Sequence, residues 1–259
     1  MAAYQLSFQL YTARNFSPQD VVLKELKSIG YDAVEPWPRD FEDDPRGFRK
    51  LIDAAGLRCP SLHLPFHGLV EQPRRYIDIA HVLGASLMIA PYLAPQDRPS
   101  DVRGWRKIGD QLAHAARAAA ENGLKVAWHN HDFEYASLVD GSRPIDILLE
   151  AAGREVGFEI DLAWVKRAGA DPLAEIQRYS QRIWAIHVKD TAPPGTTAQS
   201  GWTVAGAGVL DWKVLWPAFA STRAELLVVE HDDPDDWRQV AQDAYDFLIA
   251  MGARRVRPS

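Results

Sequence analysis

Short apolar runs rich in β-branched residues alternate with longer amphipathic stretches along the whole chain. The short runs predict strands, because they are brief and bounded by turn residues. We expect eight strands, over residues 5–10, 31–35, 57–63, 86–90, 124–129, 156–161, 182–189 and 225–230. The longer stretches predict eight helices, near residues 18–29, 44–55, 73–83, 101–122, 143–152, 171–180, 211–220 and 235–251.

Residues at the ends of these stretches support the helix assignments. Asp101 and Asp171 stand where an N-cap side chain is needed, and Gly56 and Gly84 stand where a left-handed residue ends a helix. Eight alternating strand and helix pairs are typical of a closed parallel barrel. A dinucleotide-binding fold is disfavoured, because residues 9–13 after the first strand contain no glycine. The expected fold is therefore an α/β (β/α)₈ TIM barrel, with residues 1–259 in one domain.

Composition narrows the possible partners. The chain has 29 Lys and Arg against 35 Asp and Glu, a net charge of −6, which disfavours nucleic acid and anionic membranes. Cys59 is the single cysteine, so an intrachain disulfide and a thiolate metal cluster are excluded. The first residues lack the basic start and apolar core of a signal peptide, which predicts a cytoplasmic protein.

Polar residues gather where the predicted strands end. In a (β/α)₈ barrel the carboxyl ends of the strands form the active site, so these positions are candidates for chemistry. Six of the eight predicted strands end in such residues, which are Glu35, His63, His129 with His131 and Glu134, Asp161, His187 with Lys189, and Glu230 with His231.

The alternation of side chains along a strand sharpens this picture, because residues two apart share a face. His187 then faces the barrel axis, and Trp184 faces the helices. Asp161 shares its inward face with Glu159, and Glu230 points inward on the last strand. Asp161, His187 and Glu230 are therefore expected to converge. Two carboxylates and an imidazole suit Mn²⁺, Mg²⁺, Co²⁺ or Zn²⁺.

The motifs at these positions resemble the sugar phosphate isomerase/epimerase family of xylose isomerase-like TIM barrels. Members of this family include tagatose 3-epimerase, hydroxypyruvate isomerase and inosose dehydratase. The resemblance covers nearly the whole chain and rests on FQLYTAR (8–14), VEPW (34–37), SLHLP (61–65), HNHDFEY (129–135), FEIDLAWV (158–165), IHVKD (186–190), GAGVLDW (206–212) and VVEHD (228–232).

The resemblance implies a divalent metal, with Mn²⁺ favoured, on Asp161, His187 and Glu230. It departs from the epimerases at the end of the fifth strand, where His129 replaces a metal-binding glutamate. Either Glu134 or His129 itself is expected to supply the fourth ligand. Such barrels commonly dimerise, so a homodimer is possible.

The shared chemistry of this family is removal of a proton beside a carbonyl. Glu230 or Glu134 is expected to take the proton, and His129 or His131 to return one. Lys189 is expected either to stabilise oxyanion charge or to pair with Glu159. This predicts a sugar isomerase or epimerase. Because Trp164 stands where tagatose-type epimerases have a catalytic histidine, a dehydratase or lyase acting on a keto-sugar, keto-glucoside or inosose is the alternative.

A small carbohydrate is the expected substrate, and no cluster of basic residues predicts a phosphate site. Residues expected to bind it are Gln9, Glu35, Trp37, His63 and Trp202. An apurinic endonuclease-like enzyme shares the barrel but needs three zinc ions and more histidines. A barrel without catalytic activity is the remaining alternative.

Overall fold

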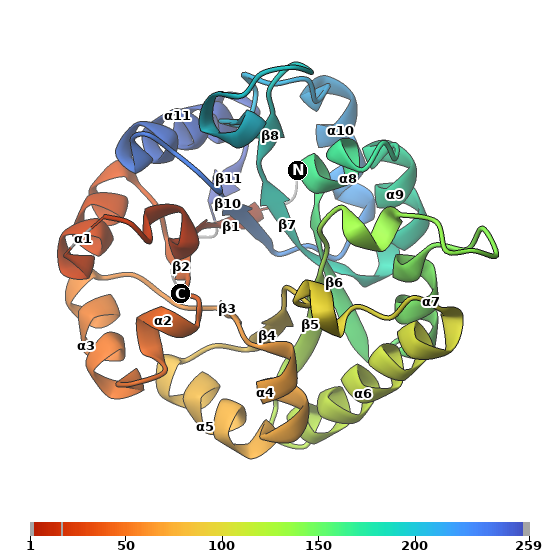
Figure 1. Cartoon of the computed structure of the whole chain (residues 1–259). Coiled ribbons are helices and arrows are strands. Elements are labelled where there is room, and N and C mark those ends of the chain that lie inside the picture. Colours follow the sequence, from red (N-terminus) through yellow and green to blue (C-terminus); the bar gives the residue numbers. More distant parts are fainter. Residues whose placement is uncertain (1–2, 17, 256–259) are drawn as a thin grey trace.

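Eight parallel strands form a nearly closed barrel inside a ring of helices, which confirms the predicted (β/α)₈ fold (Figure 1). The structure is a computed structural model that describes residues 3–16 and 18–255. The barrel strands are β1 (Ala3–Gln9), β2 (Ala33–Glu35), β3 (Ser61–His63), β4 (Leu87–Ala90), β5 (Lys125–His129), β6 (Val156–Asp161), β7 (Ile183–Val188) and β10 (Leu226–Val229). Each lies within or overlaps one of the predicted strands.

Each predicted helical stretch contains one of the longer helices. These are α1 (Gln19–Ile29), α3 (Pro45–Ala55), α5 (Pro73–Leu83), α6 (Val102–Ala120), α7 (Pro144–Ala151), α9 (Pro172–Tyr179), α10 (Trp212–Ala218) and α11 (Trp237–Ala250). Three short helices were not predicted, because four to six residues are too few to show a helical period: α2 (Pro38–Phe41), α4 (Phe66–Glu71) and α8 (Leu162–Arg167). Among the described residues, no helix is long and apolar enough to cross a membrane.

The barrel has one weak seam, between β2 and β3. The other neighbours pair in the order β2, β1, β10, β7, β6, β5, β4, β3, all parallel. Across the seam an isolated bridge joins Ala33 to Arg58, and the N–H of His63 donates to the carbonyl of Pro36 at 2.9 Å. A short strand, β11 (Arg254–Arg255), pairs in parallel with the first two residues of β1.

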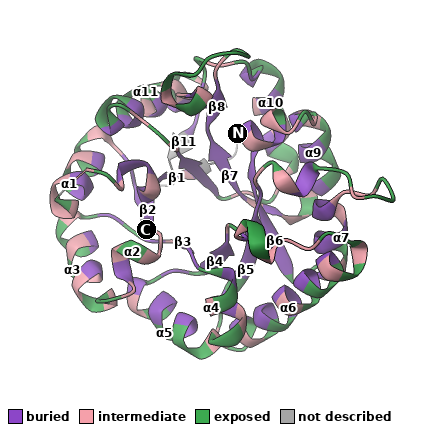
Figure 2. Ribbon diagram, viewed as in Figure 1, coloured by how far each residue is buried: buried purple, intermediate pink, exposed green. Residues whose placement is uncertain are grey.

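Apolar side chains fill two separate regions. The larger one lies between strands and helices, so the helices show buried inner and exposed outer faces (Figure 2). The smaller one fills the barrel interior with Leu87, Ile89, Ala127, Ala185, Leu226 and Val228. Trp184 packs against this inner cluster, so its predicted outward direction is wrong. The register between β6 and β7 shifts at this point, and the bulge reverses the alternation.

A hairpin after β7 forms one wall above the barrel. It pairs β8 (Asp190–Thr191) with β9 (Trp202–Thr203). The buried carboxylate of Asp190 accepts five N–H groups, from the backbone of Thr191, Gly206, Gly208 and Leu210 and from Trp212 Nε1, at 2.8–3.3 Å. A Cβ on Gly208 would lie 2.1 Å from Asp190 Oδ1, so this close approach needs glycine. One carboxylate therefore ties the hairpin to the start of α10.

Replacing Asp190 with Asn tests this role. In the Asn variant an NH₂ group replaces one carboxylate oxygen, and an NH₂ group cannot accept a hydrogen bond. Because each oxygen of Asp190 accepts at least two N–H groups, at least two of them lose their acceptor. We expect the free energy of unfolding to fall by about 3 kcal/mol, measured by chemical denaturation. Asp211→Asn is the control, because Asn caps a helix as well as Asp does and should leave stability nearly unchanged. Equal stability of the two variants would contradict the role.

Candidate functional site

Four buried side chains converge at the carboxyl ends of β5, β6, β7 and β10. His129, Asp161, His187 and Glu230 each offer one ligand atom, and these atoms all lie within 4.8 Å of one another. The inward alternation of the strands brings Asp161 and His187 to the same level, where they are register partners. Glu230 follows β10 directly. The sequence argument for Asp161, His187 and Glu230 thus agrees with their positions, and His129 joins them.

A second polar layer lies directly beneath. Two fully buried carboxylates, Glu35 and Glu159, sit among three imidazoles. His63 Nε2 lies 2.8 Å from Glu159 and 3.0 Å from Glu35, and His187 Nε2 lies 3.1 Å from both. His129 Nδ1 lies 3.1 Å from Glu159. This layer joins β2, β3, β5, β6 and β7 through side chains.

Further donors complete the layer. Gln9 Nε2 donates to Glu35 at 2.9 Å, and the hydroxyl of Ser61 donates to the other oxygen of Glu35. Burial acts to lower the pKa of His63, but the charge of Glu35 and the contact with Glu159 outweigh it and raise this pKa to about 9. Burial and the charge of Glu35 act to raise the pKa of Glu159, yet His187 and His129 hold it near 2. The carboxylates therefore stay charged, balanced by imidazolium.

The lower layer orients the ligands of the upper one. Because His187 Nε2 faces Glu35 and Glu159, its Nδ1 is turned to the upper carboxylates, 3.3 Å from Glu230 and 3.9 Å from Asp161. Two ligand atoms that each lie about 2.1 Å from a tetrahedral ion are about 3.4 Å from each other. The distances from His187 Nδ1 to Glu230 and Asp161 are close to this value. Asp161 Oδ2 is buried and accepts no hydrogen bond. The donor set therefore fits a divalent metal.

Lys189 lies beside this group and does not pair with Glu159 as one of the alternatives expected. Its buried Nζ lies 3.0 Å from Glu230, 3.5 Å from Asp161 and 2.5 Å from Asp232. Burial acts to lower the pKa of Lys189, but these three carboxylates outweigh it and raise the pKa. Its ammonium also lies 4.3 Å from the centre of the Trp202 ring. The lysine is held as a fixed positive charge.

A cavity of about 760 Å³ opens above the four-residue group. Its size is typical of sites for small-molecule ligands. Of the predicted site residues, His63, His129, His131, Glu230, Trp37 and Trp202 line it. Gln9 and Glu35 do not; they lie in the lower layer and are hydrogen-bonded to each other. Their predicted contact with substrate therefore has no direct support.

Glu134 lies on the other side of β5. Its carboxylate accepts from Trp128 Nε1 at 3.1 Å and from the N–H of His131 at 2.9 Å, and it does not join the metal-binding group. Burial raises its pKa to about 8. Trp128 faces outward from the barrel, which explains why its partner does too. Of the two alternatives for the fourth ligand, the geometry favours His129.

The cavity has further lining residues that were not predicted from the sequence to bind substrate or metal. Asp232, Tyr11, Arg14 and Tyr92 line it, all in the loops that follow β10, β1 and β4. Asp232 stands two residues beyond Glu230, so its nearness in the sequence to a predicted metal ligand could have indicated that it lies at the site. Loop residues such as Tyr92 follow no period, and their direction cannot be read from alternation.

His63 makes stability depend on pH. Its folded pKa of about 9 exceeds its ordinary 6.5, so its stabilising effect is complete below pH 6.5 and disappears as pH rises through 9. For metal-free protein we expect a loss on the order of 3 kcal/mol across this range, measured by chemical denaturation. His63→Gln should remove this part of the pH dependence and leave the part that comes from His187. Burial acts to lower the pKa of His187, but the carboxylates of Glu159 and Glu230 outweigh it and raise this pKa. The exposed control His114→Gln should keep the whole profile. Parallel profiles for wild type and His63→Gln would exclude this origin.

Residues 23–251 match the family described as Xylose isomerase-like TIM barrel. An inosose dehydratase from Geobacillus kaustophilus is 27% identical to this chain over an alignment of 198 residues. The alignment covers 66% of this chain and 62% of that protein. A sugar phosphate isomerase/epimerase from Parabacteroides distasonis superposes with a TM-score of 0.82 at 19% identity, over 96% of this chain and 95% of that one. The IolI protein with a bound zinc atom superposes with a TM-score of 0.75 at 16% identity, over 95% and 96%. The chain belongs to the xylose isomerase-like TIM barrel family.

Proposed function

We propose that this protein is a divalent-metal-dependent isomerase or epimerase that removes a proton beside a carbonyl of a sugar or keto-sugar. One observation carries the proposal. His129, Asp161, His187 and Glu230 form a buried mixed nitrogen and oxygen donor set that borders a cavity of substrate size. The zinc atom in the IolI structure supports a metal in this kind of barrel. Mn²⁺ is our preferred metal, and Mg²⁺, Co²⁺ or Zn²⁺ also suits the donors.

A metal ion held by His129, Asp161, His187 and Glu230 would act as a Lewis acid toward the carbonyl oxygen. It would stabilise the negative charge that develops when the neighbouring C–H ionises. Glu230 lines the cavity and is our candidate base for that proton. Lys189, 3.0 Å from Glu230, does not line the cavity, so it acts through Glu230. Its positive charge keeps the carboxylate ionised and in position.

His131 is our candidate for the return of a proton to the substrate. It lines the cavity from the β5 side, whereas Glu230 lines it from the β10 side. Its Nδ1 is buried without a hydrogen-bond partner. Burial and the nearby charge of Lys189 lower its pKa to about 3, so its imidazole is neutral near neutral pH. A neutral imidazole can either donate or accept at this position.

The cavity lining favours a sugar without a phosphate group. Arg14 is the one Lys or Arg among the lining residues, against the acidic Glu230, Asp232 and Asp233. The indole N–H groups of Trp37 and Trp164 are buried without acceptors. A sugar hydroxyl oxygen can accept from the Trp164 N–H, and the indole faces can pack on sugar C–H groups.

Dehydration of the substrate is the second candidate function. The same proton removal is then followed by loss of a neighbouring hydroxyl. The relative from Geobacillus kaustophilus is named inosose dehydratase, and this is the observation that favours the alternative. His131 is then our candidate to donate a proton to the departing hydroxyl, so both reactions would use the same side chains.

Metal binding can be tested without a substrate. At 100 times the dissociation constant, Mn²⁺ should raise the free energy of unfolding of the wild type by about 2.7 kcal/mol. Asp161→Asn removes one charged ligand, so this gain should largely disappear. Asp171→Asn is the matched control, because it changes only a helix cap and should keep the gain. Equilibrium dialysis gives the bound metal directly, and retention of the gain by Asp161→Asn would contradict the ligand set.

Solvent exchange tests the reaction. In D₂O with Mg²⁺, deuterium should enter one carbon of an accepted keto-sugar, 3-keto-glucoside or inosose, as followed by NMR. Glu230→Gln should slow exchange by about 10²–10⁴-fold, whereas Glu225→Gln, exposed before the same strand, should not. His131→Asn should retain exchange and lose product. A product with its hydroxyls intact indicates isomerisation or epimerisation, and loss of water indicates dehydration. Normal product formation by His131→Asn would exclude its assigned role.

A further inference from the structure

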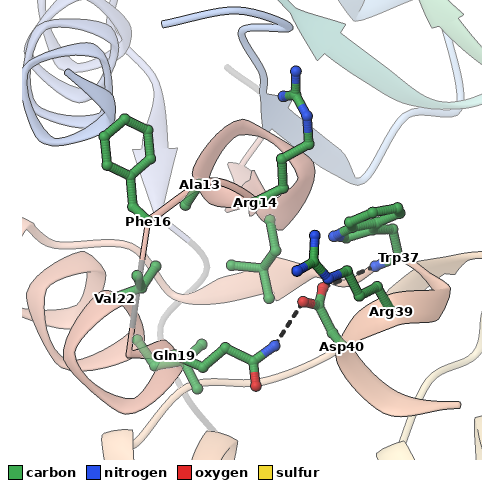
Figure 3. A pocket seen from close by; sticks show the side chains of 10 residues that line it. Ala13, Arg14, Phe16, Gln19, Val22, Trp37, Arg39 and Asp40 are labelled. Atoms are coloured by element: carbon green, nitrogen blue, oxygen red, sulfur yellow. Dashed lines mark hydrogen bonds between the residues drawn. The ribbon is translucent and has the colours of Figure 1, made fainter. Parts of the chain in front are cut away.

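A second cavity lies beside the first, in the loops that follow β1 and β2. It has a volume of about 250 Å³, and Arg14 and Trp37 line both cavities. Figure 3 shows this side pocket, with Phe16 and Val22 on one side and Trp37 with Arg39 on the other. The wall between the two cavities therefore consists partly of one indole and one guanidinium.

The floor of the side pocket is apolar, formed by Leu10, Ala13, Phe16, Val22 and Leu23. Its polar end is already paired. Gln19 Nε2 donates to Asp40 Oδ1 at 2.6 Å, and the N–H of Trp37 donates to Asp40 Oδ2 at 3.1 Å (Figure 3). With both oxygens of Asp40 engaged, the part of the pocket lined by Leu10, Ala13, Phe16, Val22 and Leu23 favours an apolar group.

The rim favours an aromatic group over an aliphatic one. The Arg14 guanidinium lies 3.9 Å from the centre of the Tyr11 ring and is also held by the carbonyl of Tyr11 at 2.9 Å. Guanidinium planes stack on aromatic faces, and Arg39 reaches the same rim (Figure 3). Trp37 Nε1 is buried without an acceptor and can donate to an oxygen attached to the ring. An apolar cavity of about 150 Å³ accommodates benzene, so this one holds a single ring.

We propose that the side pocket is a subsite for a single-ring aromatic aglycone, so that the substrate is an aryl glycoside of a keto-sugar, with the keto-sugar ring in the main cavity. The inference rests on the proposed function for the identity of the sugar end. Trp37 and Arg14 border both cavities and would flank the bond between the aryl group and the sugar, and the sugar would lie beside Glu230 and His131.

The test compares phenyl β-D-glucoside with methyl β-D-glucoside by saturation-transfer NMR titration, with no turnover required. Wild type should bind the phenyl glucoside about tenfold more tightly. Ala13→Phe fills the pocket from its floor and should abolish the preference. Ala120→Phe makes the same change at an exposed site at the end of α6 and should preserve it. Circular dichroism and the thermal midpoint establish that each variant is folded.

Phe16→Ala keeps the test decisive if Ala13→Phe does not fold. This variant enlarges the side pocket and should shift the preference from phenyl to 2-naphthyl β-D-glucoside. Equal binding of phenyl and methyl glucosides by wild type, or a preference unaffected by the folded pocket variants, would overturn the subsite. If the enzyme turns over keto-sugars but binds phenyl and methyl glucosides equally, the subsite is rejected and the proposed function stands. An aryl preference without solvent exchange in any substrate rejects the proposed reaction alone.

Discussion

Two carboxylates buried in the centre of the barrel are the constraint on which the site depends. Glu35 and Glu159 have no exposed surface, and ions so far from water are costly unless neighbours compensate them. Three histidines supply that compensation, and each must point a particular nitrogen at a carboxylate. The Nδ1 of His187 is then directed at Asp161 and Glu230. Electrostatic balance in one layer therefore fixes ligand orientation in the next.

Different parts of the barrel supply the two ends of the main cavity. His129 of β5 and Glu230, which follows β10, line one end of the cavity, whereas Tyr11, Arg14 and Trp37 come from the segments after β1 and β2. Rigid strands hold the first group in place, and loops can change with little effect on the barrel. Under the proposed function, substrate choice can therefore change on one side while the proton chemistry on the other is kept.

Much of this arrangement follows from simple periodicity. The eight strands and the longer helices were predictable because their patterns extend over several residues, and the inward positions of Asp161 and His187 follow from alternation within one strand. The alternation argument failed at Trp184, where a bulge between β6 and β7 inserts one residue into the register. The partners of Lys189 and Glu134 were not predictable, since both depend on loops whose directions no period encodes.

The weak seam between β2 and β3 has a consequence for how the barrel fluctuates. Glu35 ends one of these strands and His63 the other, and their side chains meet at 3.0 Å where the backbone ladder is sparse. The contact across the seam is thus made partly by the polar layer of the site itself. Hydrogen exchange of the β2 and β3 amides is then a reporter of the protonation of that layer, and a substitution at Glu35 or His63 alters the closure of the sheet as well as the site.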